Sequence, residues 1–138
     1  MEIAALEAQI DKDMSTYQKM PRRTFIGART KEYRFAQYVE DWRVKIERVG
    51  TLNYPEAARL KKIYGSLQLT ISIRADGSVE STEISRSSGQ PILDAAAERI
   101  VKLAAPFPPF PADIRRDTDI LSITRTWSFT QSDKLESE

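Results

Sequence analysis

The chain has 138 residues and a net charge of +1, and it is 41% hydrophobic and 30% charged, which suits one compact domain with an extension. A net charge this close to zero gives no general attraction to nucleic acid or anionic lipid. Cysteine and histidine are both absent, which excludes disulfides, thiolate nucleophiles, Cys-ligated zinc and the commonest general base. No apolar run approaches the roughly 20 residues that cross a bilayer, and the acidic opening residues do not resemble a signal peptide.

The first 30 residues predict a helical extension followed by a basic linker. Between residues 1 and 20, apolar residues recur every three or four positions, at Ile3, Leu6, Ile10, Met14 and Tyr17. This pattern favours a solvated helix that continues from an upstream region. A dimerising coiled coil, and hence a weak homodimer, is the alternative. The prolyl residue at position 21 interrupts the helix, and the basic stretch around it favours a solvated linker over a contact with an anionic envelope polymer or lipid headgroup.

Two helices are predicted next. The segment 31–49 carries a broad apolar stripe, which must pack against a sheet or a partner; it consists of Phe35, Val39, Trp42, Ile46 and Val49. A glycine is typical of the position just after a helix, so Gly50 is expected to end this one. A shorter helix is predicted over 55–63, because a proline stands at its first position. Its expected inward side chains are Ala57, Leu60 and Ile63.

A strand pair and a third helix follow. Residues 67–73 alternate strictly between apolar and polar, as in a strand with one buried face. After a turn at 74–77, a second strand at 78–86 changes parity between Val79 and Ile84, which predicts either a bulge or an early strand end between them. A helix at 91–104 is expected to cover the sheet through Leu93, Ala96, Ala97, Ile100, Leu103 and Ala104.

The last part of the chain contains a proline-rich segment and a third strand. Residues 106–111 favour a stiff connector whose two phenylalanines plug the edge of the core, over a polyproline ligand for another domain. Residues 119–130 are rich in β-branched and aromatic residues and contain neither proline nor glycine, which predicts a strand. Residues 131–138 are mostly polar and are expected to form a disordered tail.

These elements predict an α+β fold with a small antiparallel three-stranded sheet and its helices packed on one face. The hairpin and the crossover helix favour the order two–one–three, with the strands numbered along the chain. The third strand then has a free outer edge, which proteins normally protect. Such an edge indicates a docking site for an extended peptide through strand addition. Hydrogen bonds of about 0.5–1.5 kcal/mol each predict reversible capture of roughly micromolar affinity.

One motif connects this organisation with a known family. The segment Tyr54-Pro55-Glu56-Ala57-Ala58-Arg59 is followed by Gly65, Leu67, Leu69, the Asp76-Gly77 turn and Val79. In this order, residues 54–130 resemble the C-terminal domain of TonB-family energy transducers. The resemblance implies that residues 31–130 form a periplasmic domain, anchored to the inner membrane by an upstream segment outside this chain.

The resemblance also implies partners. An ExbB–ExbD-type proton-driven motor would act on the anchor. The last strand would pair with the peptide box of TonB-dependent outer-membrane transporters, for uptake of iron complexes, haem or similar nutrients. Transferred to this chain, the contact residues are Arg59, Thr118, Asp119, Ile120, Leu121, Ser122, Ile123, Thr124, Arg125 and Thr126. Position 59 is usually glutamine in the family, so the arginine there is a departure.

A TolA-like envelope adaptor that binds another periplasmic partner is the alternative function. An enzyme is not expected, because the acidic residues are scattered and the sequence has no nucleophile elbow, phosphate-binding glycine loop or metal-ligand spacing. The chain is accordingly expected to use no cofactor and no metal ion, and to bind no nucleic acid.

Overall fold

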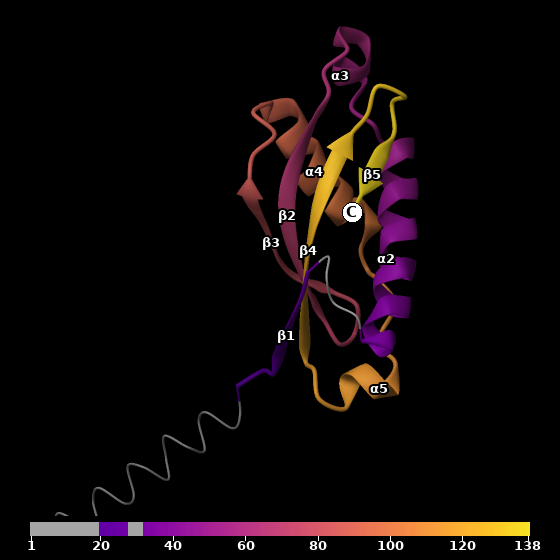
Figure 1. Ribbon diagram of the computed structural model, residues 1–138, viewed down its shortest axis with the longest axis vertical. Coiled ribbons are helices and arrows are strands. Elements are labelled where there is room, and N and C mark those ends of the chain that lie inside the picture. The colour runs from indigo at the N-terminus through magenta and orange to yellow at the C-terminus, as the bar shows by residue number, and fades with distance from the viewer. Residues whose placement is uncertain (1–19, 28–31) are drawn as a thin grey trace, which may run out of the picture.

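A mixed five-stranded sheet forms the centre of the molecule, in a computed structural model that describes residues 20–27 and 32–138. Its strands are β1 (Arg23–Ile26), β2 (Gly65–Arg74), β3 (Val79–Arg86), β4 (Ile120–Phe129) and β5 (Leu135–Ser137). The helices are α2 (Tyr33–Leu52), α3 (Glu56–Lys61), α4 (Pro91–Ala104) and α5 (Ala112–Arg115). Helix α2 stands beside the sheet and α4 crosses behind it, while α3 and α5 lie at opposite ends of the molecule (Figure 1).

The three strands predicted from the sequence form the inner part of this sheet. Strand β2 lies between β3 and β4 and is antiparallel to both, so these three strands keep the predicted two–one–three order. Two further strands extend the sheet beyond β4: β1 pairs with it in parallel and β5 in antiparallel orientation. The prediction of a purely antiparallel three-stranded sheet is therefore wrong, because short segments at both ends of the chain supply two more strands.

The sheet has an apolar and a polar face, as the alternation in the sequence predicts. On the apolar face, the fully buried side chains of β2 are Leu67, Leu69, Ile71 and Ile73. On the polar face, hydroxyl groups of β2 and β4 meet in three pairs with Oγ–Oγ distances of 3.0, 2.7 and 2.8 Å: Ser66–Ser128, Thr70–Thr124 and Ser72–Ser122. The predicted bulge of β3 is present, since Ser81 and Val79 pair with consecutive residues of β2 and Glu80 is skipped.

Helices α2 and α4 cover the apolar face. Their buried side chains include Phe35, Tyr38, Val39, Trp42 and Ile46 of α2 and Leu93, Ala96, Ala97, Ile100, Val101 and Ala104 of α4. Leu103 was expected to point inward but is 52% exposed, and Val101 takes its place. Helix α2 does not end at Gly50 but continues to Leu52. The glycine is needed inside the helix because Leu135 of β5 packs directly against it.

The proline-rich segment forms the predicted connector. Phe107 and Phe110 are buried and contact Trp42 and Tyr38 of α2, with ring centroids 6.4 and 5.4 Å apart. The turn between β2 and β3 packs on this segment, where the Phe107 N–H donates to the Gly77 carbonyl at 2.9 Å. Gly77 has a φ of +91°, and a Cβ there would lie 2.8 Å from the Phe107 carbonyl carbon. Conformation and space therefore both require glycine at this turn.

Other expectations differ from the structure near the ends of the molecule. In α3 the buried residue is Ala58, whereas Ala57 and Leu60 are exposed, because this short helix touches the core with one side only. Residues 131–138 are not a disordered tail, since Leu135–Ser137 forms β5, and part of the expected linker forms β1. The helix predicted over residues 1–20 falls, except for Met20, outside the described residues.

Candidate strand-docking site

The outer edge of β4 is the candidate site that the sequence identifies. Two contacts fix its orientation: the Ile120 N–H donates to the Arg22 carbonyl at 3.1 Å, and the Thr126 N–H donates to the Glu138 carbonyl at 2.8 Å. In an antiparallel ladder, successive residues direct their N–H and C=O groups to alternate sides. The even-numbered residues of β4 therefore direct these groups away from β2, toward the outer edge.

This edge is covered by the chain itself. Strand β1 runs along its first half in parallel, from Arg23 opposite Ile120 to Ile26 opposite Ile123. Strand β5 covers the end of β4, from Trp127 to Phe129. The prediction of a free edge on the third strand is therefore wrong. The chain protects both parts of the edge with its own short strands, which prevents unwanted pairing with other molecules.

Strand β5 is held by the burial of one side chain. Leu135 is 1% exposed and packs against Gly50 of α2, where a Cβ would lie 2.9 Å from the Leu135 Cβ. Glu138 continues the pairing beyond the strand, because it and Thr126 exchange both main-chain hydrogen bonds. The close approach that glycine permits explains why a mostly polar segment joins the sheet.

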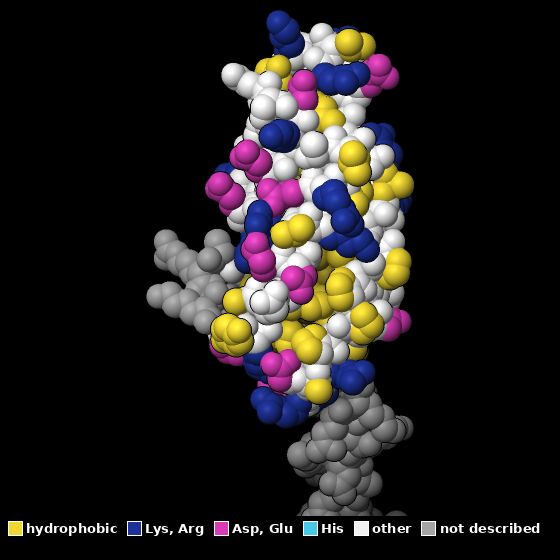
Figure 2. Space-filling model, turned by 90° about the vertical axis from the view of Figure 1, so that its right-hand side faces the viewer, with side chains coloured by type: hydrophobic (Ala, Val, Ile, Leu, Met, Phe, Trp, Pro, Cys, Tyr) yellow, Lys and Arg dark blue, Asp and Glu magenta, His cyan; other side chains and the backbone are white. Residues whose placement is uncertain are grey.

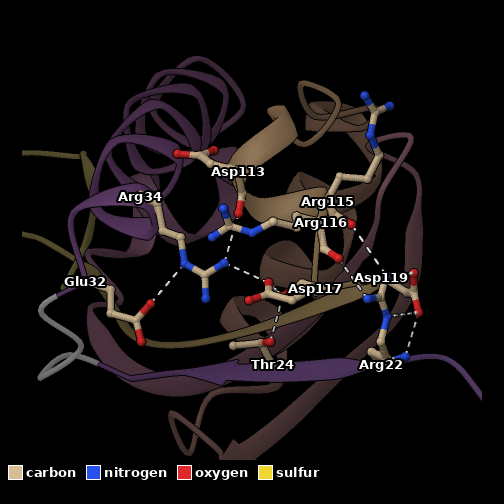
Figure 3. A network of polar contacts seen from close by, with 10 residues as sticks. Arg22, Thr24, Glu32, Arg34, Asp113, Arg115, Arg116, Asp117 and Asp119 are labelled. Carbon is tan, nitrogen blue, oxygen red and sulfur yellow. Dashed lines mark hydrogen bonds and ion pairs between the residues drawn. The ribbon is translucent and has the colours of Figure 1, made fainter.

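Strand β1 begins with a polar clamp. Arg22 binds the Asp119 carboxylate with two nitrogens, at 3.1 and 3.2 Å, and also donates to the Arg116 carbonyl at 2.9 Å (Figure 3). These hydrogen bonds from Arg22 hold the pKa of Asp119 below its ordinary value. Beside the clamp, the hydroxyl groups of Thr24 and Thr118 lie 2.8 Å apart. The start of β1 is thus attached to the loop that leads into β4.

A second arginine connects β1 to the far side of the sheet. Arg23 lies on the polar face and donates to Ser122 Oγ of β4 at 3.1 Å and to Ser72 Oγ of β2 at 3.2 Å. Its other terminal nitrogen binds the carboxylate of Glu80 on β3, at 2.8 and 3.2 Å. One side chain therefore spans the sheet from β1 to β3, and the bulge of β3 supplies its carboxylate partner.

Arg34 forms an ion-pair cluster next to the clamp. It binds Glu32 at 3.0 Å and Asp117 at 2.7 Å, and it donates to the Asp113 carbonyl at 2.9 Å (Figure 3). The hydrogen bond from Arg34 lowers the pKa of Asp117. The cluster joins the start of α2 to α5, and so it fixes the loop from which β4 begins.

The structure does not bring all predicted contact residues together. Those from position 118 to 123 lie along β1, Thr124 and Arg125 lie between the ends of β1 and β5, and Thr126 pairs with Glu138. Arg59, by contrast, is exposed on α3 at the far end of the molecule, where it pairs with Glu56 at 3.5 Å (Figure 1). The predicted contact residues therefore form two separate regions of the surface.

The described residues contain no cluster of acidic side chains suited to a metal ion. None of their helices is long and apolar enough to cross a membrane. On the face that carries α2, hydrophobic side chains gather in the lower half among acidic and basic ones (Figure 2). The described residues of the candidate site offer main-chain pairing, supported by arginine–carboxylate pairs.

Comparison with known families matches residues 51–130 to the C-terminal domain of the Gram-negative bacterial TonB protein. The chain belongs to this TonB C-terminal domain family. The resemblance suggested by the sequence motif is thereby confirmed. The domains of this family are periplasmic, non-enzymatic transducer domains that interact with outer-membrane transporters. The match includes α3 and β2 to β4, whereas β1 and β5 lie outside it.

A comparison with solved structures finds similar chains. The solution structure of the Helicobacter pylori TonB C-terminal domain (residues 194–285) has a TM-score of 0.52 and 23% identity, and the alignment covers 74% of this chain and 97% of that one. A longer version (residues 179–285) has a TM-score of 0.50 and 28% identity, with 68% and 82% covered. The HasB C-terminal domain is 31% identical, with a TM-score of 0.41 and 69% and 75% covered. A comparison with curated proteins found no match.

The pairing of β1 and β5 with the edge of β4 is not predicted from the sequence. The charges of Arg22 and Arg23 are typical of a solvated linker, which conceals their role as clamps. Weak signals are nevertheless present: Thr24-Phe25-Ile26 is a run of three β-prone residues, and Leu135 is an isolated apolar residue in a polar segment. Both signals are too short to show a periodicity.

Proposed function

We propose that this domain transmits force from an inner-membrane motor to outer-membrane transporters by pairing β4 with the transporter's peptide box. The supporting observation is the parallel pairing of β1 with β4, since it demonstrates that this edge accepts a four-residue extended segment. The motor, of ExbB–ExbD type, would act through an upstream inner-membrane anchor. The cargo would be an iron complex, haem or a similar nutrient.

A transporter peptide would replace β1 rather than β5. Strand β1 buries one large apolar side chain, Ile26, whereas Phe25 is 73% exposed. Its ion pairs with Asp119 and Glu80 are partly exposed, and such pairs contribute about 0–1 kcal/mol each. Strand β5 cannot leave without exposing Leu135, which is part of the core. Displacement of β1 therefore needs less free energy.

When a peptide replaces β1, the number of main-chain hydrogen bonds to β4 stays the same, because the peptide forms each bond that β1 loses. The net affinity then depends on the docking free energy of β1 and on the side chains of the peptide. Since β1 is short and mostly exposed, the resulting contact is reversible, as a cyclic mechanical coupler requires.

A reversible cross-link tests this proposal. The side chains of Thr24 and Thr118 already touch, and the chain contains no native cysteine, so cysteines at both positions can form a disulfide that holds β1 on β4. Synthetic peptides from the N-termini of outer-membrane transporters are titrated into the oxidised and the reduced protein, and binding is followed by NMR. We expect shifts along β4 in the reduced protein and none in the oxidised protein.

The oxidised and reduced forms are the same polypeptide, so the substitutions themselves are controlled. A chain with Thr24→Cys alone reports any effect of oxidant. Equal binding by the oxidised and reduced proteins would show that the peptide docks without displacing β1. Absence of binding by the reduced protein and by the parent chain would disprove strand addition, and is the result that a TolA-like adaptor would give.

A further inference from the structure

A small cavity lies where the cover of β4 is interrupted, between the end of β1 and the end of β5. Its volume is about 200 Å³, and its walls come from β1, α2, β4 and β5. They include Ile26, Val39, Arg43, Arg125 and Ser137. The strands leave Thr124 and Arg125 of β4 without a register partner on the outer side, so the cavity opens at the candidate docking edge itself.

Arg125 faces the cavity with an incompletely used guanidinium group. It lies on the apolar face of β4, between Ile123 and Trp127, and is half-buried. Its Nη1 donates to the carbonyl of Thr124 at 3.0 Å, and within the described residues it has no ion-pair partner. A guanidinium carries five N–H donors, so most of its donor capacity is unused. Burial without a carboxylate lowers the pKa of Arg125.

Ser137 presents a second unsatisfied group in the same cavity. It is 3% exposed, and its Oγ has no hydrogen-bond partner among the described residues. A buried hydroxyl without a partner is costly and uncommon. An arginine and a serine O–H can both donate, so the ligand that satisfies both is an acceptor, and a negative charge suits the arginine.

The acidic side chains around the cavity do not supply that acceptor. Arg43, the other cation in the wall, is bound by Glu40 and Glu47, so these carboxylates are already used. Glu138 also lines the cavity, but its main chain is fixed by Thr126, and its carboxylate forms no ion pair with the residues that the structure describes. Among the described residues, the donors of Arg125 and Ser137 therefore have no negatively charged partner in this cavity.

We propose that this cavity is a carboxylate subsite for an acidic side chain of the extended peptide that pairs with β4 in place of β1. The inference rests on the proposed strand exchange and specifies the peptide that it favours. In the register of β1, Ile26 lies opposite Ile123. If a peptide binds in this register, one of its residues takes the place of Ile26. Alternate residues of a strand share one face, so the peptide residue two positions later lies opposite Arg125. The favoured peptide has a large apolar residue followed two positions later by aspartate or glutamate.

Two synthetic peptides test this subsite. Both contain the sequence of residues 22–27, Arg-Arg-Thr-Phe-Ile-Gly, followed by glutamate in one and by glutamine in the other. Binding is measured on the full chain carrying Thr24→Pro, which removes an N–H that β1 directs to β4 and so vacates the edge. We expect the glutamate peptide to bind roughly tenfold more tightly, as a charge-assisted hydrogen bond predicts.

The source of the preference is tested with substitutions in the cavity wall. Arg125→Gln should abolish the difference between the two peptides, and Ser137→Ala should reduce it. Arg43→Gln is the matched control, since this arginine is already neutralised and its loss should leave the preference intact. Equal affinity of the two peptides for the chain with Arg125 would refute the subsite while strand exchange stands. If neither peptide binds, strand exchange fails and the subsite fails with it.

Discussion

Whether the substitution Gly50→Ala stabilises or destabilises the protein depends on β5, a strand far along the chain. Alanine stabilises a helix relative to glycine by up to about 1 kcal/mol, because glycine loses more backbone entropy on folding. Gly50 lies within α2, so the isolated helix would gain from Gly50→Ala. In the folded chain, however, the new Cβ would lie 2.9 Å from the Leu135 Cβ and 3.1 Å from its Cγ. These distances are well below van der Waals separation, so Leu135 has to move.

The magnitude follows from what Leu135 and β5 contribute. Burying a leucine side chain is worth about 1.5–3 kcal/mol, and each main-chain hydrogen bond of β5 adds about 0.5–1.5 kcal/mol. After subtraction of the gain in the helix, Gly50→Ala should lower the free energy of unfolding of the full chain by about 2 kcal/mol. In a chain that ends at Thr130, which lacks β5, the same substitution should raise it by up to about 1 kcal/mol.

Urea denaturation followed by tryptophan fluorescence measures both effects. Four chains are compared: full-length and truncated, each with glycine or alanine at position 50. The difference between the two substitution effects isolates the coupling between the helix and β5. A loss of stability of the same size in the truncated chain would mean that the added methyl group clashes elsewhere. A gain in the full chain would mean that β5 does not pack on α2.

Three further predictions concern β4 and its cover. Trp127→Ala should lower the free energy of unfolding by about 3–5 kcal/mol, because the indole is fully buried; urea denaturation measures this, and a cost near zero would contradict its place in the core. Glu80→Gln should weaken β1 docking and raise amide exchange at Ile26, whereas Glu83→Gln, the matched control on the same strand, should not. The folded-state pKa of Asp119 is lowered, so its stabilisation of β1 is complete above the ordinary aspartate pKa of about 3.9 and is lost as the pH falls through the folded-state pKa. Protection of Ile26 should follow this titration, and it should lose that pH dependence in Asp119→Asn.

The elements that bury a whole face could be predicted from local pattern. Strands β2 and β4 have ten residues each and α2 has 20, long enough for the period of the hydrophobic residues to identify them. The connector at 106–111 was equally predictable, since prolines exclude both a helix and a central strand. The boundaries of these elements differ from the predicted ones by one to three positions, with the largest difference at the end of α2.

The cover of the docking edge could not be predicted in this way. Strands β1 and β5 have only four and three residues, too few to show a period. Each is fixed by contacts far along the chain: Arg22 binds a carboxylate 97 positions away, and Leu135 needs the glycine at position 50. Such pairing depends on tertiary context rather than on local propensity. The strand itself could therefore be predicted from its sequence, whereas the cover of its edge could not.

Strand β5 is held on β4 more firmly than β1. This difference allows the chain to protect the edge of β4 and still to bind a peptide there. Without β1, the outward-facing Ile120 and Ser122 would offer two N–H and two C=O groups, or about four hydrogen bonds of about 0.5–1.5 kcal/mol each. That edge is long enough to capture a peptide, and left open it would also invite aggregation. A strand held by exposed ion pairs satisfies both demands, since it protects the groups and can still be exchanged. The buried Leu135 keeps β5 in place meanwhile, so the exchange is confined to the half of β4 that ends at the Arg125 cavity.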